Sequence, residues 1–196
     1  MQHLENHQKE QKTIDIIQAG KVGLIILAIS AVVFGIPFWL IWQPIFSWWG
    51  LALGLMILPV AFLVGAVFHE LIHGFCFGLC AKNGFRSIRF GVLREYFTPY
   101  CHCKEPLKIK HYILSALMPA LVLGAVPLVI AFFKGSVLLL IFGVVFIAAA
   151  TGDFMVVWLL RKENLNDYVQ DHPSEAGCYV YPQPPEGGFG DDVTKN

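Results

Sequence analysis

The sequence contains few charged residues for its length. Only 14% of the 196 residues are Asp, Glu, Lys or Arg, whereas 56% are hydrophobic. A soluble domain usually contains about 25% charged residues. A soluble protein of this size has no core large enough to bury so much apolar surface, so lipid must cover part of the chain. The composition excludes an ordinary soluble domain and indicates an integral membrane protein.

Other signals are also missing. Residues 1–20 contain no basic region followed by a short apolar core and a cleavage site, which argues against a removable signal peptide. The chain has no internal repeat, no phosphate-binding glycine loop and no basic stripe, so we expect no nucleic-acid partner. The number of cysteines is odd, and we interpret them as reduced thiols and not as a disulfide framework. They are Cys76, Cys80, Cys101, Cys103 and Cys178.

Four apolar stretches predict four transmembrane helices, at about residues 22–42, 51–80, 112–133 and 136–160. Each stretch can cross a hydrocarbon layer of about 30 Å, which requires roughly 20 helical residues. Helices are required because lipid offers the backbone no hydrogen-bonding partners. We therefore predict an all-α integral membrane fold with local kinks at the prolines inside the spans. These prolines are Pro37, Pro59, Pro119 and Pro127.

The membrane domain is predicted to cover residues 21–162, between an N-terminal segment of residues 1–20 and a C-terminal tail of residues 163–196. With four spans, both termini lie on the same side of the membrane. Only Lys134 of the 14 basic residues then falls on the opposite side. Because basic residues concentrate on the cytoplasmic side of membrane proteins, we expect a multi-pass protein of the cell membrane with both termini in the cytoplasm.

Two cytoplasmic segments carry weaker signals. In the loop of residues 81–106, Ile88, Phe90 and Val92 alternate with small or polar residues, which predicts a short β-strand or hairpin. Such a strand could hold an extended peptide by strand addition. The tail is acidic and rich in proline and glycine, and we expect it to be extended or partly disordered.

The motif His69-Glu70-Leu71-Ile72-His73 carries the strongest functional signal. Residues four apart share one face of a helix, so His69 and His73 can bind the same metal ion. Glu70 lies beside them and can act as a general base toward a zinc-activated water. The alternative interpretation is two core histidines and an ion-paired glutamate. The location favours the metal site, because an ionisable residue inside a membrane span costs about 2.5–3.5 kcal/mol to insert and usually serves a function.

A catalytic zinc ion needs a third protein ligand, and Asp153 is the best candidate. It is the only charged residue in the fourth apolar stretch. The two histidines lie roughly 10–16 Å from the cytoplasmic end of their predicted helix, and Asp153 lies about 10 Å from the end of its own. The three side chains should therefore lie at the same depth.

Other residues remain candidates for metal binding. Asp171 and His172 lie in a tail that could fold back over the site. Cys76 shares the helical stripe of the histidines, although a thiolate ligand is more typical of a structural site. The Cys101-His102-Cys103 segment has donor atoms, but its adjacent spacing suits a single metal ion poorly.

A family resemblance rests on three features: the histidine motif in a membrane helix, the later proline-containing helix of Ser115–Pro119, and Gly152-Asp153 in another helix. Together they resemble the putative zincin peptidase family of small bacterial membrane proteins. More distantly, they are similar to the site-two proteases, which cleave substrates within the membrane. The resemblance covers about residues 50–180. It implies that His69, His73 and Asp153 bind zinc and that Glu70 is the general base.

These observations favour a membrane-embedded zinc metalloprotease that hydrolyses peptide bonds near the cytoplasmic face, with a membrane protein or a peptide as its substrate. Two alternatives stay open. A metal- or haem-binding membrane carrier would use His69 and His73 without catalysis, and a pseudoprotease would only bind a partner protein. Glu70 separates these hypotheses, because hydrolysis requires it and transport does not.

Overall fold

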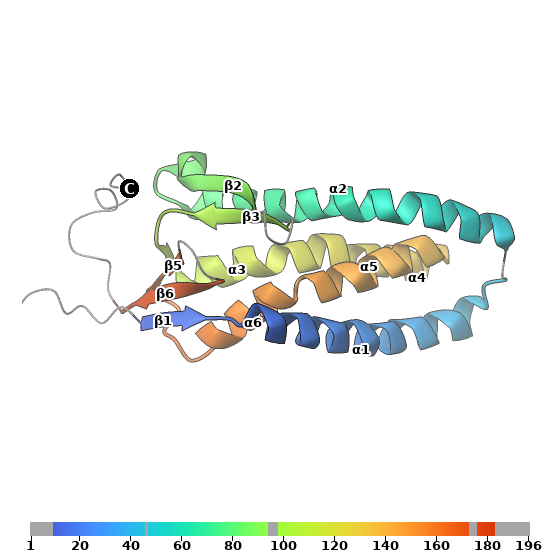
Figure 1. Cartoon of the computed structure of the whole chain (residues 1–196). Helices are drawn as coiled ribbons and strands as arrows, with labels where there is room; N and C mark the ends of the chain where they lie inside the picture. Colours follow the sequence, from blue (N-terminus) through green and yellow to red (C-terminus); the bar gives the residue numbers. More distant parts are fainter. Residues whose placement is uncertain (1–9, 46, 94–97, 173–175, 183–196) are drawn as a thin grey trace, which may run out of the picture.

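The computed structural model of the chain describes residues 10–45, 47–93, 98–172 and 176–182. Most of these residues are helical. Figure 1 shows a bundle of long helices with strands gathered at one end of it. The fold therefore has two parts, a helical bundle and a smaller β region at one end of that bundle.

The two longest helices form opposite sides of the bundle in Figure 1. They are α1 (Ile16–Trp42) and α2 (Trp48–Cys80). Asp15 caps α1, because its Oδ1 atom accepts a hydrogen bond from the Ile17 N–H at 2.8 Å. Ser47 caps α2 in the same way, through the Gly50 N–H at 3.3 Å. The histidine motif lies near the C-terminal end of α2, which is the end beside the strands.

The next helical segments run as one continuous helix. They are α3 (Ile109–Pro119), the π-helical segment η2 (Ala120–Ala125) and α4 (Val126–Lys134). The irregular segment follows Pro119 directly. Proline has no N–H group and its ring crowds the preceding turn, and a π-helical turn is one way to absorb that disturbance. The helix therefore changes type directly after Pro119, whereas the predicted kink at this residue stays a prediction.

The predicted fourth span, residues 136–160, consists of two helices. They are α5 (Val137–Ala149) and α6 (Thr151–Leu160), bent by 42° at the break between them. Residues 136–160 contain no proline that would explain the bend. Instead, the Thr151 Oγ1 atom donates a hydrogen bond to the Ala148 carbonyl at 2.6 Å, and Gly152 follows. A hydroxyl bonded back to the helix bends it, and glycine weakens it. The break gives α6 its own first turn, which contains Asp153.

The number of apolar helices agrees with the predicted membrane architecture. By length and composition, α1, α2 and the continuous helix Ile109–Lys134 can each cross a membrane, and the bent pair α5–α6 can provide a fourth crossing. These helices expose large apolar side chains such as Trp39, Leu55 and Phe133. Such surfaces suit a lipid environment better than water.

A β-hairpin follows α2 and a short 3₁₀ helix, η1 (Gly84–Ser87). Its strands are β2 (Ile88–Leu93) and β3 (Thr98–Cys103), which pair antiparallel. The predicted strand or hairpin is therefore confirmed. The hairpin packs on α2, where Gly74 and Gly78 leave room for the rings of Phe90 and Phe85.

A second sheet shows that the all-α assignment was wrong for part of the chain. Its strands are β1 (Glu10–Thr13), β4 (Leu107–Lys108), β5 (Tyr168–Asp171) and β6 (Gly177–Tyr181), in the antiparallel order β1-β6-β5-β4. The N-terminal segment thus pairs with the tail, with Glu10 opposite Val180. We expected the tail to be extended or partly disordered, and at β5 and β6 it is extended and paired, because β-branched and aromatic residues favour strands there.

The remaining prolines and glycines that prompted that expectation, Pro184, Pro185 and Gly187-Gly188, lie outside the described residues. Beneath the second sheet, a hydrophobic cluster joins the strands to the helices. Its buried members are Phe77, Cys103, Leu107, Ile109, Tyr112, Leu160, Val169, Cys178 and Val180. The β region is therefore packed firmly on the end of the bundle that carries the histidine motif.

Candidate metal centre

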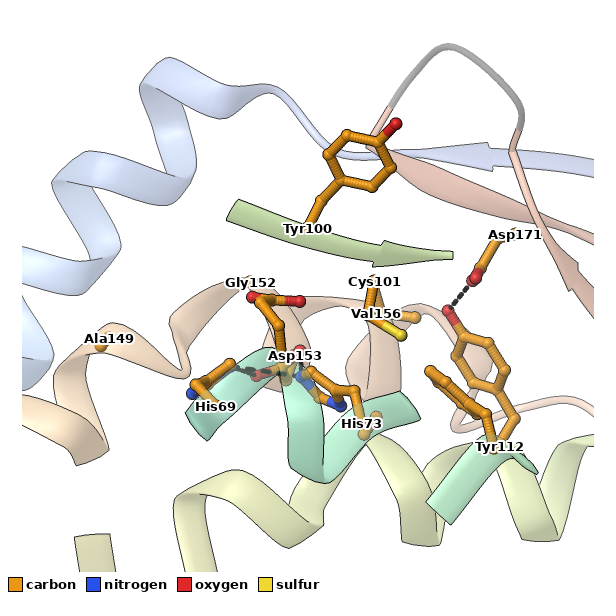
Figure 2. A pocket seen from close by; sticks show the side chains of 13 residues that line it. His69, His73, Tyr100, Cys101, Tyr112, Ala149, Gly152, Asp153, Val156 and Asp171 are labelled. Carbon is orange, nitrogen blue, oxygen red and sulfur yellow. Dashed lines mark hydrogen bonds and ion pairs between the residues drawn. The ribbon is translucent and has the colours of Figure 1, made fainter. Parts of the chain in front are cut away.

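Three side chains from two helices converge beside the β region. The Nε2 atoms of His69 and His73 each lie 3.2 Å from a carboxylate oxygen of Asp153. The two Nε2 atoms are themselves 3.2 Å apart. One donor atom from each residue lies within 4.8 Å of the others. The structure thus brings together the three residues that the sequence analysis named as metal ligands (Figure 2).

The backbone of α3 fixes the orientation of His73. Its Nδ1 atom lies 3.1 Å from the Ser115 carbonyl oxygen. Because a carbonyl only accepts hydrogen bonds, Nδ1 carries the proton, and the neutral ring keeps a lone pair on Nε2. Residue 119 is a proline, so Ser115 lacks the N–H that would normally bond to its carbonyl one turn later. Pro119 thereby leaves this carbonyl available to His73.

The donor set fits a zinc ion. The Asp153 carboxylate and the His73 Nε2 atom both offer lone pairs to the same small volume, and such atoms repel each other unless a cation lies between them. Two histidines and one carboxylate are the ligands of many hydrolytic zinc sites, which keep a fourth position open. A histidine that donates its second ring N–H to a carbonyl is also typical of metal ligation. His69, His73 and Asp153 can therefore hold the metal.

A cavity of about 250 Å³ adjoins these three residues, and Glu70 also lines it. Figure 2 shows β3 above the histidines, with Tyr100 and Cys101 on that strand. Cys101 and Glu70 line this cavity together. Glu70 therefore faces the cavity without belonging to the donor group itself.

The tail residue Asp171 lines the same cavity but contacts other partners. Its Oδ1 atom accepts a hydrogen bond from the Tyr112 hydroxyl at 2.6 Å, and its Oδ2 atom accepts one from the Cys103 N–H at 2.8 Å. Burial raises the pKa of the Asp171 carboxyl above its ordinary value, although both hydrogen bonds oppose this shift. The tail does fold back over the site, but Asp171 is not in the donor group that contains Asp153.

The other candidates are also separate from the donor group. His172 does not line the cavity, and its Nε2 atom lies 3.3 Å from the Gln11 side-chain nitrogen. All five cysteines are unpaired thiols, and within the described part of the chain none of them belongs to the potential metal-binding group. Sequence reasoning missed Tyr112, which opens the third apolar stretch and carries no motif signal.

One of three comparisons with known proteins found a match, and it agrees with this geometry. The curated proteins and the solved structures gave no significant match. The model of one protein family matches residues 62–168, a segment that contains His69, Glu70, His73 and Asp153. Because this match covers more than half of the chain, the protein belongs to the family described as putative zincin peptidase.

Proposed function

We propose that the protein is a zinc-dependent metallopeptidase that hydrolyses peptide bonds at a site within the membrane domain. The observation that carries this proposal is the convergence of His69, His73 and Asp153 beside Glu70 in one cavity. Membership of a zincin peptidase family supports the same chemistry. The histidines and Asp153 are the proposed ligands, and Glu70 is the proposed general base.

Each residue has a distinct role in this proposal. When bound, zinc lowers the pKa of water and polarises a scissile carbonyl. Glu70 accepts a proton from the attacking water and returns it to the leaving amine. It can do so because its carboxylate faces the cavity and is not needed as a ligand. Ser115 holds the His73 ring in the tautomer that ligation requires.

We further propose that the site lies near the cytoplasmic face. His73 lies about 10 Å from the end of α2 at Cys80, counted along the helix. The pairing of β1 with β6 puts the two described ends of the chain side by side, which supports an even number of crossings. With Lys134 alone on the other side, the positive-inside rule gives cytoplasmic termini.

This orientation can be tested with single cysteines introduced in a background without other reactive cysteines. A cysteine at Ser47 should react with a membrane-impermeant reagent added from outside, whereas one at the exposed Arg86 should not. The reverse result would overturn the orientation.

The hairpin meets the cavity through one strand only. Among the described residues that line the cavity, Tyr100 and Cys101 belong to β3 and none belongs to β2. The segment Ile88–Val92, in which we expected a substrate-binding strand, therefore does not line this cavity.

The decisive experiment replaces Glu70 with Gln and compares the purified protein with the parent. Glutamine keeps the shape of the side chain but cannot shuttle a proton, so we expect unchanged zinc content and hydrolysis reduced by about 10²–10⁴. Glu163→Gln is the matched control, because Glu163 pairs with Lys12 outside the cavity. Full activity in Glu70→Gln would contradict the peptidase and favour a carrier. Loss of zinc would instead make Glu70 a ligand.

A further inference from the structure

We infer that Asp171 is a positioning residue that orients Glu70 through the backbone of β3, so that the C-terminal tail completes the catalytic site. This inference rests on the proposed metallopeptidase function. Asp171 touches neither the donor group nor Glu70 directly; it binds the Cys103 N–H and the Tyr112 hydroxyl.

The register of the hairpin sets these directions. The Lys104 N–H donates to the Ser87 carbonyl at 2.9 Å, and the facing pairs continue with His102 opposite Arg89. In an antiparallel pair, alternate residues turn their N–H groups toward the partner strand and away from it. The N–H groups of Cys101 and Cys103 therefore both point away from β2.

Asp171 holds this outer edge of β3, because its carboxylate accepts a hydrogen bond from the Cys103 N–H at 2.8 Å. The Cys101 N–H points to the same edge, and Cys101 and Glu70 line the same cavity. A carboxylate that accepts a backbone N–H is held in place by it. Cys101 is only two residues from the anchored Cys103, so a shift of this edge changes the donor that β3 offers to Glu70.

The position of Asp171 is fixed by contacts with α3 and β6. The buried Tyr112 of α3 donates its hydroxyl proton to Oδ1 at 2.6 Å. Asp171 also belongs to β5 and faces the buried Cys178 of β6. In Figure 2, Tyr112 and Asp171 lie to one side of the cavity, and His69 lies to the other. The pair therefore ties β3 to α3 without entering the donor group.

The test compares Asp171→Ala, Asp171→Asn and the control Asp167→Ala, an acidic residue of the same tail that does not line the cavity. Alanine leaves the Cys103 N–H without its acceptor. Asparagine keeps an oxygen for that N–H and an amide for the Tyr112 hydroxyl. For each variant we would measure the zinc content, the thermal unfolding temperature and the amide hydrogen exchange at Cys101. The kinetic quantities are KM and the kcat per zinc-loaded molecule.

We expect Asp171→Ala to keep its zinc and to change KM by less than about threefold, while kcat falls by about 10–100-fold, the usual cost of losing an outer partner in a metal site. Exchange at Cys101 should become faster. Asp171→Asn should recover most of kcat, and Asp167→Ala should match the parent. A purely structural role would lower stability but leave kcat per zinc-loaded molecule unchanged.

Three results would overturn the positioning role while leaving the peptidase intact. They are a kcat for Asp171→Ala within about twofold of the parent, unchanged exchange at Cys101, or loss of zinc, which would make Asp171 a ligand. If the parent shows no hydrolysis that depends on Glu70, the proposed function fails, and the positioning role fails with it. The exchange measurement needs no substrate, so it can refute the link between Asp171 and Cys101 by itself.

Discussion

The cavity is built by two regions that obtain their geometry in different ways. The proposed zinc ligands all come from helices, and two of them lie within one stretch of α2. The wall of the cavity that contains Cys101 is strand β3. Asp171, which accepts a hydrogen bond from the Cys103 N–H of this strand, belongs to strand β5 and lies 68 residues beyond Cys103 in the sequence. Local helix spacing thus brings the two histidines together and helix packing adds Asp153, whereas strand pairing sets what surrounds these donor atoms. Metal binding and catalysis should therefore respond to different substitutions.

The largest expected contrast is between the two aspartates of the cavity. Asp153→Ala removes a proposed ligand, so zinc content should fall toward that of a His69→Ala, His73→Ala double variant. Asp171→Ala should keep about one zinc per chain, because its carboxylate binds Tyr112 and Cys103 instead. Losing even an outer partner of a metal ligand costs about 10–100-fold in affinity or activity, and a direct ligand should cost more.

Metal analysis after dialysis against a weak chelator measures this contrast. Equal zinc content in Asp153→Ala and Asp171→Ala would contradict the view that Asp153, on a helix, binds the metal and that Asp171, on a strand, does not. Full zinc in the double histidine variant would remove the metal site altogether.

A smaller effect is expected where the hairpin rests on α2. A Cβ atom at Gly74 would overlap the ring of Phe90, so Gly74→Ala must displace this ring from the surface of α2. Overpacking of this kind costs about 1–3 kcal/mol, measurable as reduced thermal or denaturant stability in detergent, and activity should fall with it. Zinc content should not change, although His73 is the adjacent residue. Gly35→Ala is the matched control, because nothing lies within 4 Å of its Cβ position. Equal stability of the two variants would show that the hairpin does not need this contact.

The smallest effect concerns thiol reactivity in the β region. Burial raises the pKa of Cys103 and Cys178 to about 12. At pH 8 only about 10⁻⁴ of such thiols are ionised, and the thiolate is the reactive form. The ionised fraction of the Cys103 and Cys178 thiols becomes large only as the pH approaches 12. Alkylation followed by mass spectrometry should therefore modify the exposed Cys80 first and the other two only after unfolding. Rapid modification of Cys103 in the folded protein would mean that the β region opens readily.

The sequence could predict the helical half of the cavity because its rules are local. Residues four apart share a helix face, and depth along a helix follows from counting residues. These two rules placed Asp153 at the same depth as His69 and His73, and the structure shows that the three side chains also meet. The break at Ala150 was not predicted, because its cause is the Thr151 hydroxyl and not a proline.

The strand-built half could not be predicted in the same way. Alternating apolar and aromatic residues in Gly177–Tyr181 were a usable strand signal, but the prolines of the tail obscured it. No local pattern specifies that Glu10 pairs with Val180. Since the tail was not expected to form strands, Asp171 was considered only as a rival metal ligand, and its partner Tyr112 was not considered at all.

The pairing of β1 with β6 has a consequence for biosynthesis. A ribosome releases the chain from its N-terminus, so Glu10–Thr13 emerge long before Gly177–Tyr181, their partners in the sheet. The apolar helices can enter the bilayer and collect zinc during that interval, while Asp171 is still being made. A chain that ends before β5 should accordingly bind zinc but hydrolyse peptides at least as slowly as Asp171→Ala. Under the proposed function, full activity therefore waits until the last strand has been translated.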